Sequence, residues 1–318
     1  MYRVVRDVEA SLRLHFLRAA SDCGLLGALE TPSPKAELVE RLRVQRPELL
    51  DALLELGLAL KELSESNGRY RIRGRRSRAV ASEAGDPLLA MIEEMLSYHA
   101  DVYRQFTSRL RGGALGNYLD EFGGTIARSS RVLDPFVRGF VRSLAGTGRP
   151  VRILEVGCGS GIYLRYAAEA NPQVTGVALD IQPSVVEQAR ANLTAWGVAD
   201  RFHVLLADIR NPPPEVAGPF DLITLYNNVY YFEERERPAL FRTFRSWLAP
   251  GGALALVSLF HGRTLASVDL DLALRSTVGH TALPELEPVR AQLREGGFVH
   301  VKTVKLMPIE PLYGLVAK

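Results

Sequence analysis

The chain has 318 residues, of which 47% are hydrophobic, and its formal net charge is only +3. This length is enough for two domains with separate cores, and no apolar run reaches the ~18 residues that a membrane-spanning helix needs. The two cysteines, Cys23 and Cys158, lie far apart and lack metal-binding spacing, so we expect neither a disulfide framework nor a zinc site. The first residues lack the apolar core of a signal peptide, and we expect a cytoplasmic protein.

Residues 1–145 are expected to form a separate N-terminal domain made mainly of helices. The dipeptide Asn67-Gly68 favours a hairpin turn between two short flanking stretches. Helices followed by a hairpin are the element order of a winged-helix domain. The expected helices are 11–23, 35–42, 47–63, long segments within 79–110, and 133–144, with a loop at 111–117 and a linker at 146–150.

The hairpin region carries many arginines, which raises the question of nucleic-acid binding. A basic wing can contact phosphate groups. The helix at 47–63, however, presents leucines and carboxylates such as Glu48 and Asp51 instead of donors for base edges. We therefore expect this helix to lie in a core or a dimer interface, and methylation of RNA through the arginines stays an alternative. The arginines are Arg69, Arg71, Arg73, Arg75, Arg76 and Arg78.

The most informative stretch of the chain begins near its middle. Val151–Val156 is an apolar run long enough for one buried parallel strand. Gly157, Gly159 and Gly161 follow at alternate positions, where glycine allows a tight turn and a close approach of the backbone to a ligand. After a helical segment, a second apolar run ends at Asp180, whose carboxylate can accept hydrogen bonds from ribose hydroxyls. This unit is therefore expected to bind a cofactor that contains a nucleoside.

Two residues of this stretch argue against a dinucleotide. The dinucleotide pattern requires glycine where this chain has Ile162, and Glu155 places a negative charge where a pyrophosphate would lie. The charge of Glu155 suits a cofactor with positive groups, such as the ammonium and sulfonium of S-adenosylmethionine. An NAD-dependent oxidoreductase stays an alternative, which these two residues oppose.

The glycine motif, E-x-G-x-G-x-G, resembles the first motif of the class I methyltransferases that use S-adenosylmethionine. The resemblance covers about 150–318 and implies a Rossmann-like, doubly wound α/β sheet of seven strands, the last one antiparallel to the rest. It implies that Asp208 reads the adenine amine and that Ile209 packs on the ring. Together with Glu155, the three glycines and Asp180, we expect Ile181 and Asn227 in the cofactor site. The further expected elements are strands at 202–207, Phe220–Tyr226, 253–259, 299–304 and Leu312–Ala317, and a helix at 233–248.

The order of the two halves resembles the small-molecule O-methyltransferases of plant and bacterial secondary metabolism. In that family an N-terminal winged-helix domain mediates dimerisation, and neighbouring helices roof the substrate pocket. The resemblance implies a homodimer formed through residues 1–145, a catalytic domain at 146–318 and a small-molecule acceptor. A winged-helix regulator that only senses S-adenosylmethionine stays an alternative from another class.

One position of the family's catalytic motif differs in this chain. These O-methyltransferases usually carry a histidine general base just after the fourth strand, and the matching position here is Tyr231. An unperturbed tyrosine has a pKa of about 10 and is a poor base near neutral pH. The family segment that supports the base corresponds to a stretch containing His280, so the resemblance points to a Tyr231–His280 pair as the catalytic group. His261, which follows the fifth strand, is the second candidate.

The acceptor is expected to be a small, partly apolar and aromatic metabolite, because aromatic side chains could surround it. O-methylation is narrowly preferred, and C- or N-methylation of an aromatic or indole-like ring is the alternative, because those nucleophiles need less help from a base. No cluster of histidine and carboxylate residues has the spacing of a metal site, so no metal is expected. The expected pocket residues are Tyr98, His99, Tyr103, Phe106 and Tyr230.

Overall fold

The computed structural model describes residues 2–146, 148–216 and 218–318. The chain divides into two compact units, Met1–Ala100 and Asp101–Lys318. This division differs from the predicted boundary between 145 and 146, because the helix at Asp134–Leu144 packs against the helix at Ile162–Ala170. The predicted linker at 146–150 contains residue 147, which lies outside the described residues.

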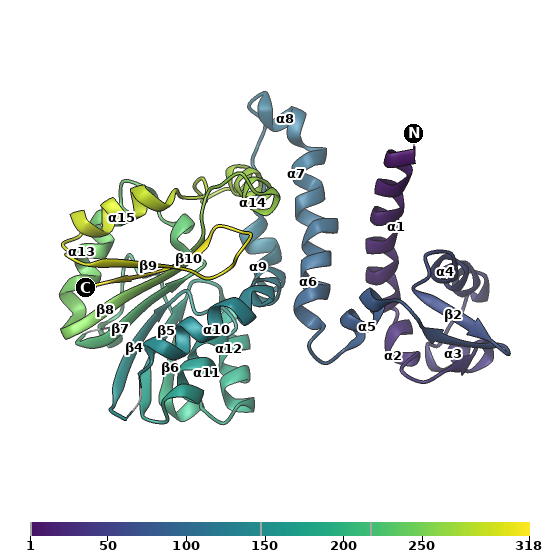
Figure 1. Ribbon diagram of the computed structural model, residues 1–318, viewed down its shortest axis with the longest axis horizontal. Coiled ribbons are helices and arrows are strands. Elements are labelled where there is room, and N and C mark those ends of the chain that lie inside the picture. The colour runs from purple at the N-terminus through teal and green to yellow at the C-terminus, as the bar shows by residue number, and fades with distance from the viewer. Residues whose placement is uncertain (1, 147, 217) are drawn as a thin grey trace. The chain divides into compact units, whose positions relative to one another are not determined.

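The first unit consists mainly of helices (Figure 1). It also contains a small antiparallel sheet with the strand order β1-β3-β2. The predicted hairpin turns at Asn67 and Gly68, whose φ angles of 54° and 74° are ones that asparagine and glycine adopt readily. The elements are α1 (Tyr2–Asp22), α2 (Leu25–Ala28), β1 (Ser33–Pro34), α3 (Lys35–Arg41), α4 (Pro47–Ala59), β2 (Leu63–Ser66), β3 (Arg69–Ile72), α5 (Arg75–Ala81), α6 (Asp86–Glu94) and the π-helical turn η1 (Met95–His99).

The core of the first unit contains a buried carboxylate. Glu62 is 1% exposed and accepts hydrogen bonds from the Arg13 guanidinium at 2.8 Å and from the Ser77 hydroxyl at 2.8 Å. Burial alone would raise the pKa of Glu62, but these donors outweigh it and lower that pKa. Gly74 is required beside it, because a Cβ there would lie 1.7 Å from Glu62 Oε2.

The second unit is built on one mostly parallel sheet. It begins with the short helices α7 (Ala100–Arg104), at the division between the units, and α8 (Phe106–Leu110). The other helices are α9 (Tyr118–Ser129), η2 (Ser130–Leu133), α10 (Asp134–Leu144), α11 (Ile162–Ala170), α12 (Pro183–Ala195), η3 (Ala199–Arg201), η4 (Pro214–Val216), η5 (Val229–Tyr231), α13 (Arg237–Trp247), α14 (Leu265–Arg275) and α15 (Leu286–Glu295). The strands are β4 (Val151–Val156), β5 (Val174–Asp180), β6 (Phe202–Leu206), β7 (Phe220–Tyr226), β8 (Leu248–Leu259), β9 (Val301–Lys305) and β10 (Leu312–Ala317).

The seven strands lie in the order β6-β5-β4-β7-β8-β10-β9. The first five in this order are parallel, and β10 is antiparallel to both β8 and β9. The chain runs outward from β4 to β6 on one side and then returns to β7 on the other. Such a reversal leaves a crevice at the carboxyl ends of the central strands, where ligands bind in open α/β sheets.

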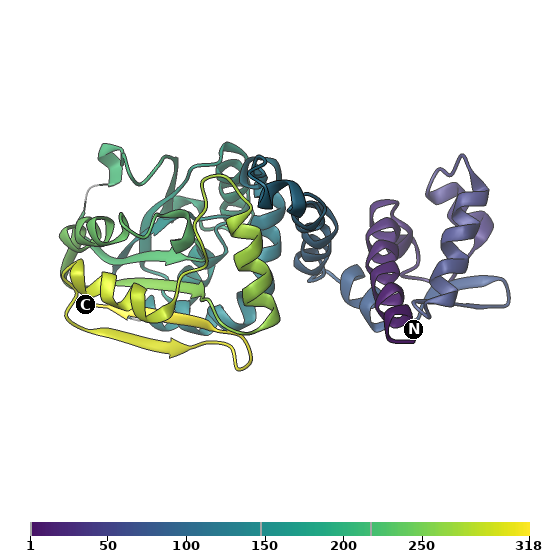
Figure 2. The same cartoon turned by 90° about the horizontal axis from the view of Figure 1, so that it is seen from above.

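Helices cover both faces of this sheet (Figure 2). On one face, α10, α11 and α12 contribute Val137, Ile162 and Ala189 to a shared core. On the other face, α13 and α15 contribute Phe241 and Val289 to a second core. The predicted doubly wound, seven-stranded α/β fold is confirmed, including its antiparallel strand at Leu312–Ala317. Within the described residues, no helix has the length and hydropathy of a transmembrane span.

Several predicted boundaries shift in the structure. The helix predicted at 47–63 ends at Ala59, because Leu63 already starts β2 after a turn in which Lys61 has a φ of 59°. The helix predicted at 233–248 begins at Arg237 and has a proline in its first turn. Proline is tolerated there because a backbone N–H at this position would have no partner within the helix. The sequence patterns do not predict helix α9, which lines the cavity described next.

Candidate active site

A cavity of about 1030 Å³ opens where β4, β5 and β7 end. Seven of the nine predicted cofactor residues line it, and Glu155 and Gly161 are not among its lining residues. Helix α9 contributes a wall that no pattern in the sequence predicts. The predicted residues that line the cavity are Gly157, Gly159, Asp180, Ile181, Asp208, Ile209, Asn227, Tyr230 and Tyr231. Residues that were not predicted also line it, among them Gly123, Ile126, Ala127, Ser130, Tyr163, Gln182, Arg210, Tyr226, Asn228 and Phe232.

The glycine turn has backbone conformations that favour glycine. Gly157 has a φ of 67°, and a Cβ there would lie 2.5 Å from the side-chain nitrogen of Asn228. Gly159 has a φ of 53°, and no atom lies within 4 Å of its Cβ position, so its backbone is open to a ligand. Asn227, at the end of β7, also has a positive φ of 57°, which asparagine tolerates better than most residues.

Asp180 connects the second strand to the glycine turn. Its Oδ2 accepts a hydrogen bond from the Gly159 N–H and its Oδ1 one from the Gln182 N–H, each at 3.1 Å. Burial raises the pKa of Asp180 despite these two donors. Each carboxylate oxygen keeps a further lone pair that can accept a hydrogen bond from a ligand hydroxyl.

Three buried polar atoms lie beside the cavity without a protein partner. Within the part of the chain that the structure describes, Glu155 Oε1, the Tyr226 hydroxyl and Asn228 Oδ1 form no hydrogen bond. Glu155 is 2% exposed, and burial raises its pKa to about 8. Unsatisfied buried polar atoms are rare in proteins and require a physical explanation. Here they fit a site that receives a positively charged, hydrogen-bonding ligand.

We expect Glu155 to make the ligand-free protein less stable as the pH rises. The unfolded chain loses this proton near its ordinary pKa of 4.5, whereas the folded protein holds it up to about 8. Between these two values the folded state binds more protons than the unfolded chain. The contribution of Glu155 to the free energy of unfolding is therefore fully present at the acidic end of this range, and it falls by up to about 1.4 kcal/mol for each unit by which the pH rises. Across this pH range, the melting temperature should change less with pH in Glu155→Gln than in the exposed control Glu295→Gln. Matching profiles in the two variants would contradict a protonated Glu155.

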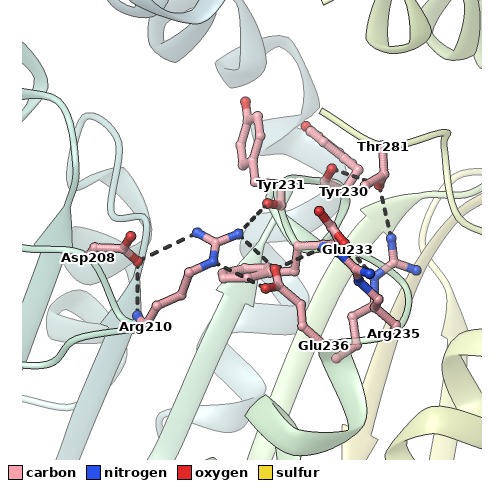
Figure 3. A network of polar contacts seen from close by, with 10 residues as sticks. Asp208, Arg210, Tyr230, Tyr231, Glu233, Arg235, Glu236 and Thr281 are labelled. Carbon is pink, nitrogen blue, oxygen red and sulfur yellow. Dashed lines mark hydrogen bonds and ion pairs between the residues drawn. The ribbon is translucent and has the colours of Figure 1, made fainter. Parts of the chain in front are cut away.

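Asp208 and Arg210 form a polar network with the loop after β7 (Figure 3). The Arg210 backbone N–H donates to Asp208 Oδ1 at 2.9 Å, and the guanidinium lies 3.6 Å from the same oxygen. The guanidinium also donates to the Tyr231 carbonyl at 2.8 Å and to Glu236 Oε1 at 2.7 Å. Side-chain hydrogen bonding to Glu236 raises the pKa of Arg210, so this group stays charged.

The structure brings Tyr231 and His280 together, although 48 residues separate them in the sequence. Their ring centroids lie 4.7 Å apart in an edge-to-face arrangement. His280 Nδ1 lies 3.0 Å from the Val278 carbonyl, which can only accept, so Nδ1 carries the proton and Nε2 has a free lone pair. Burial lowers the pKa of His280 and keeps the ring neutral.

The other predicted residues lie in different places. His261 lines a second cavity that His280 also lines. Tyr98 and His99 belong to the first unit, where they are buried with ring centroids 4.4 Å apart. Tyr103 and Phe106 are not among the described lining of the main cavity, and the Tyr103 hydroxyl donates to Asp269, which raises the pKa of Tyr103 to about 12. The described residues include no group of three or more histidine, cysteine or carboxylate side chains that could hold a metal ion.

The central part of the chain is similar to known proteins. Residues 153–252 match a protein family described as a methyltransferase domain. Part of the chain is 39% identical over 100 residues to the catechol O-methyltransferase of Mycobacterium tuberculosis, covering 30% of this chain and 46% of that protein. The chain spans less than half the length of the first curated relatives that it matches, at 25%, 19% and 46% of theirs.

Solved structures resemble the chain over its whole length. An O-methyltransferase family protein from Burkholderia thailandensis has a TM-score of 0.78 at 18% identity, with 100% of this chain and 97% of that one covered. Human N-acetylserotonin methyltransferase, solved in complex with S-adenosylmethionine, has a TM-score of 0.76 at 16% identity over 100% and 97% of the two chains. These likenesses show the fold. The family match over residues 153–252 and this fold both agree with the predicted class I methyltransferase architecture.

Proposed function

We propose that the chain, whose residues 153–252 form a methyltransferase domain, transfers the methyl group of S-adenosylmethionine to a small molecule. The observation that carries this proposal is the composition of the cavity. A glycine turn and two strand-end carboxylates, Asp180 and Asp208, meet there beside the buried Glu155. This arrangement supports recognition of a nucleoside that also carries positive charge.

The residues of the cavity fit this cofactor part by part. The carboxylate of Asp180 would accept hydrogen bonds from the ribose, and Asp208 and Ile209 would contact the adenine. The unpartnered polar atoms around Glu155 and Asn228 would face the amino acid end. When bound, the cofactor supplies an electrophilic methyl group, and the protein's part is to align the acceptor, exclude water and hold the acceptor's proton.

The Tyr231–His280 pair supports O-methylation as the preferred reaction. His280 is neutral and has a free lone pair on Nε2, so it can take the proton of an acceptor hydroxyl. Tyr231 lines the cofactor cavity in front of it and can orient a small aromatic acceptor. His280 itself does not line the described part of this cavity, and this placement favours C- or N-methylation as the second candidate.

The proposal is tested by calorimetric titration of the purified protein with S-adenosylhomocysteine. We expect saturable binding at one molecule per chain. Phenols, indoles and amines are then screened for label from methyl-labelled S-adenosylmethionine, and the atom labelled in the product separates O-, N- and C-methylation. A folded protein that binds no S-adenosylhomocysteine would overturn the proposal.

We also propose that the first unit is a winged-helix domain that forms a homodimer. Helix α1 exposes Val4, Val5, Val8 and Leu12 to 64%, 59%, 53% and 44%, an apolar surface that suits a second copy. Sedimentation at micromolar concentration is expected to show a dimer, and Val4→Glu with Val8→Glu should give a monomer because the charges would be buried unpaired. Arg3→Glu with Asp7→Arg alters charges on the same helix without removing apolar surface and should remain dimeric. A wild-type monomer would refute this assignment.

A further inference from the structure

The loop at 229–236, which carries Tyr231, is held by hydrogen bonds to three successive carbonyl groups. The Tyr230 carbonyl accepts hydrogen bonds from the Thr281 N–H at 3.1 Å and from its hydroxyl at 2.9 Å. The Phe232 carbonyl accepts one from Arg237 at 3.0 Å, and Arg237 also donates to the Thr281 hydroxyl at 3.1 Å. Between them, the Tyr231 carbonyl accepts its bond from Arg210 at 2.8 Å.

The two arginines differ in their relation to the cavity. Arg237 is 3% exposed and is not part of the described lining of the cofactor cavity, so it supports the loop from within the protein. Arg210 lines the cavity, and 39% of its side chain is exposed. A ligand in the cavity can therefore change the surroundings of Arg210 directly.

Arg210 also reaches across the sheet. It follows β6, whereas Tyr231 follows β7, and β5 and β4 lie between these two strands. Its guanidinium contacts Asp208 on one side and Tyr231 and Glu236 on the other, and it lies 4.9 Å from the ring centre of Phe232 (Figure 3). One side chain therefore joins the loop expected to contact the adenine to the loop of the expected catalytic pair.

We infer that Arg210 is a positioning residue through which occupation of the adenine side of the cavity orders Tyr231. This inference rests on the proposed function. Without ligand, water screens the contacts among the partly exposed charges of Asp208, Arg210 and Glu236. A ligand that covers Asp208 excludes this water, and the contacts of Arg210 become stronger in a less polar medium. The loop of Tyr231 then gains order before an acceptor arrives.

The test compares backbone hydrogen exchange at 229–236 with and without saturating S-adenosylhomocysteine. Useful reporters are the N–H groups of Tyr231 and Phe232, which donate to the carbonyls of Asn228 and Val229. The proteins are the wild type, Arg210→Met and the control Arg235→Met. Arg235 belongs to the same loop, but within the part of the chain that the structure describes its charge pairs only with Glu233, and its side chain is 86% exposed.

In the wild type and the control, S-adenosylhomocysteine should slow exchange at this loop by about tenfold, a size usual for coupling between sites. In Arg210→Met the ligand still binds, and its effect on exchange should be less than about twofold. A purely structural role would speed exchange equally with and without ligand, and so would leave the ligand effect unchanged.

Two results would overturn the inference, and they differ in what else they affect. Full ligand-dependent protection in Arg210→Met at saturation overturns the role of Arg210 and leaves the proposed function intact. Absence of ligand binding in the folded wild type overturns both. Should Arg210→Met not fold, Glu236→Gln removes the anchor of the same guanidinium and is expected to reduce the ligand effect in the same way.

Discussion

His280→Ala is expected to lower kcat for a phenolic acceptor by about 100- to 10,000-fold, the usual contribution of a positioned general base. The affinity for S-adenosylhomocysteine should stay within about threefold of the wild type, because His280 is not part of the described lining of the cofactor cavity. The measurement is steady-state kinetics with an acceptor found in the screen. Tyr231→Phe should lower kcat less, since it removes a hydroxyl and keeps the ring.

The pH profile separates a base from a structural role for His280. Because burial lowers the pKa of this imidazole from its ordinary 6.5, the neutral, proton-accepting form persists to lower pH. The wild-type rate should therefore stay level through pH 6.5 and fall only below it, and this acid limb should disappear in His280→Ala. His261→Ala is the matched control, because His261 lines the same second cavity. Wild-type rates in His280→Ala combined with a large loss in His261→Ala would reassign the base.

Asp180→Ala is expected to weaken S-adenosylhomocysteine binding by about 100-fold. The carboxylate would accept hydrogen bonds from the ribose, and a hydrogen bond to a charged group contributes about 1.5–3 kcal/mol. The substitution also removes the acceptor of the Gly159 N–H, which holds the glycine turn. Calorimetric titration measures the loss.

Two further variants show whether the loss arises in the cavity. Asp180→Asn keeps one side-chain oxygen and should give an intermediate affinity. Asp200→Ala, which changes an exposed aspartate in the turn η3, should bind like the wild type. Wild-type affinity in Asp180→Ala would show that the ribose is held elsewhere.

The cofactor side of the site could be predicted because its chemistry is local in the sequence. Within 30 residues, Val151 to Asp180 contain a strand, a glycine turn, a helix and a second strand that ends in a carboxylate. Parallel strands place their carboxyl ends at one edge, so the motif already determines which side chains meet there. The residue type alone also shows that Tyr231 occupies the position where the resembled family usually has a histidine base.

The remaining parts depend on contacts that no local pattern encodes. Helix α9 faces the cavity through small residues such as Gly123 and Ala127, and residues of this type do not mark a helix as the wall of a ligand site. The link from Arg210 to Tyr231 joins loops that are adjacent only because β6 and β7 belong to the same sheet. The division of the chain at Ala100 reflects how α10 packs on α11, which the sequence cannot show.

The position of β10 between β8 and β9 has a consequence for the kinetics of folding. In the described sheet, β9 is the edge strand and pairs only with β10, the strand that follows it in the chain. The two strands can pair locally as a hairpin, but β9 joins the rest of the sheet only when β10 docks on β8. Until then, the parallel part of the sheet has an open edge at β8. Because this docking pairs residues that are far apart in the sequence, such as Leu312 and Leu259, a late phase of refolding should report the attachment of β9 and β10 to the sheet.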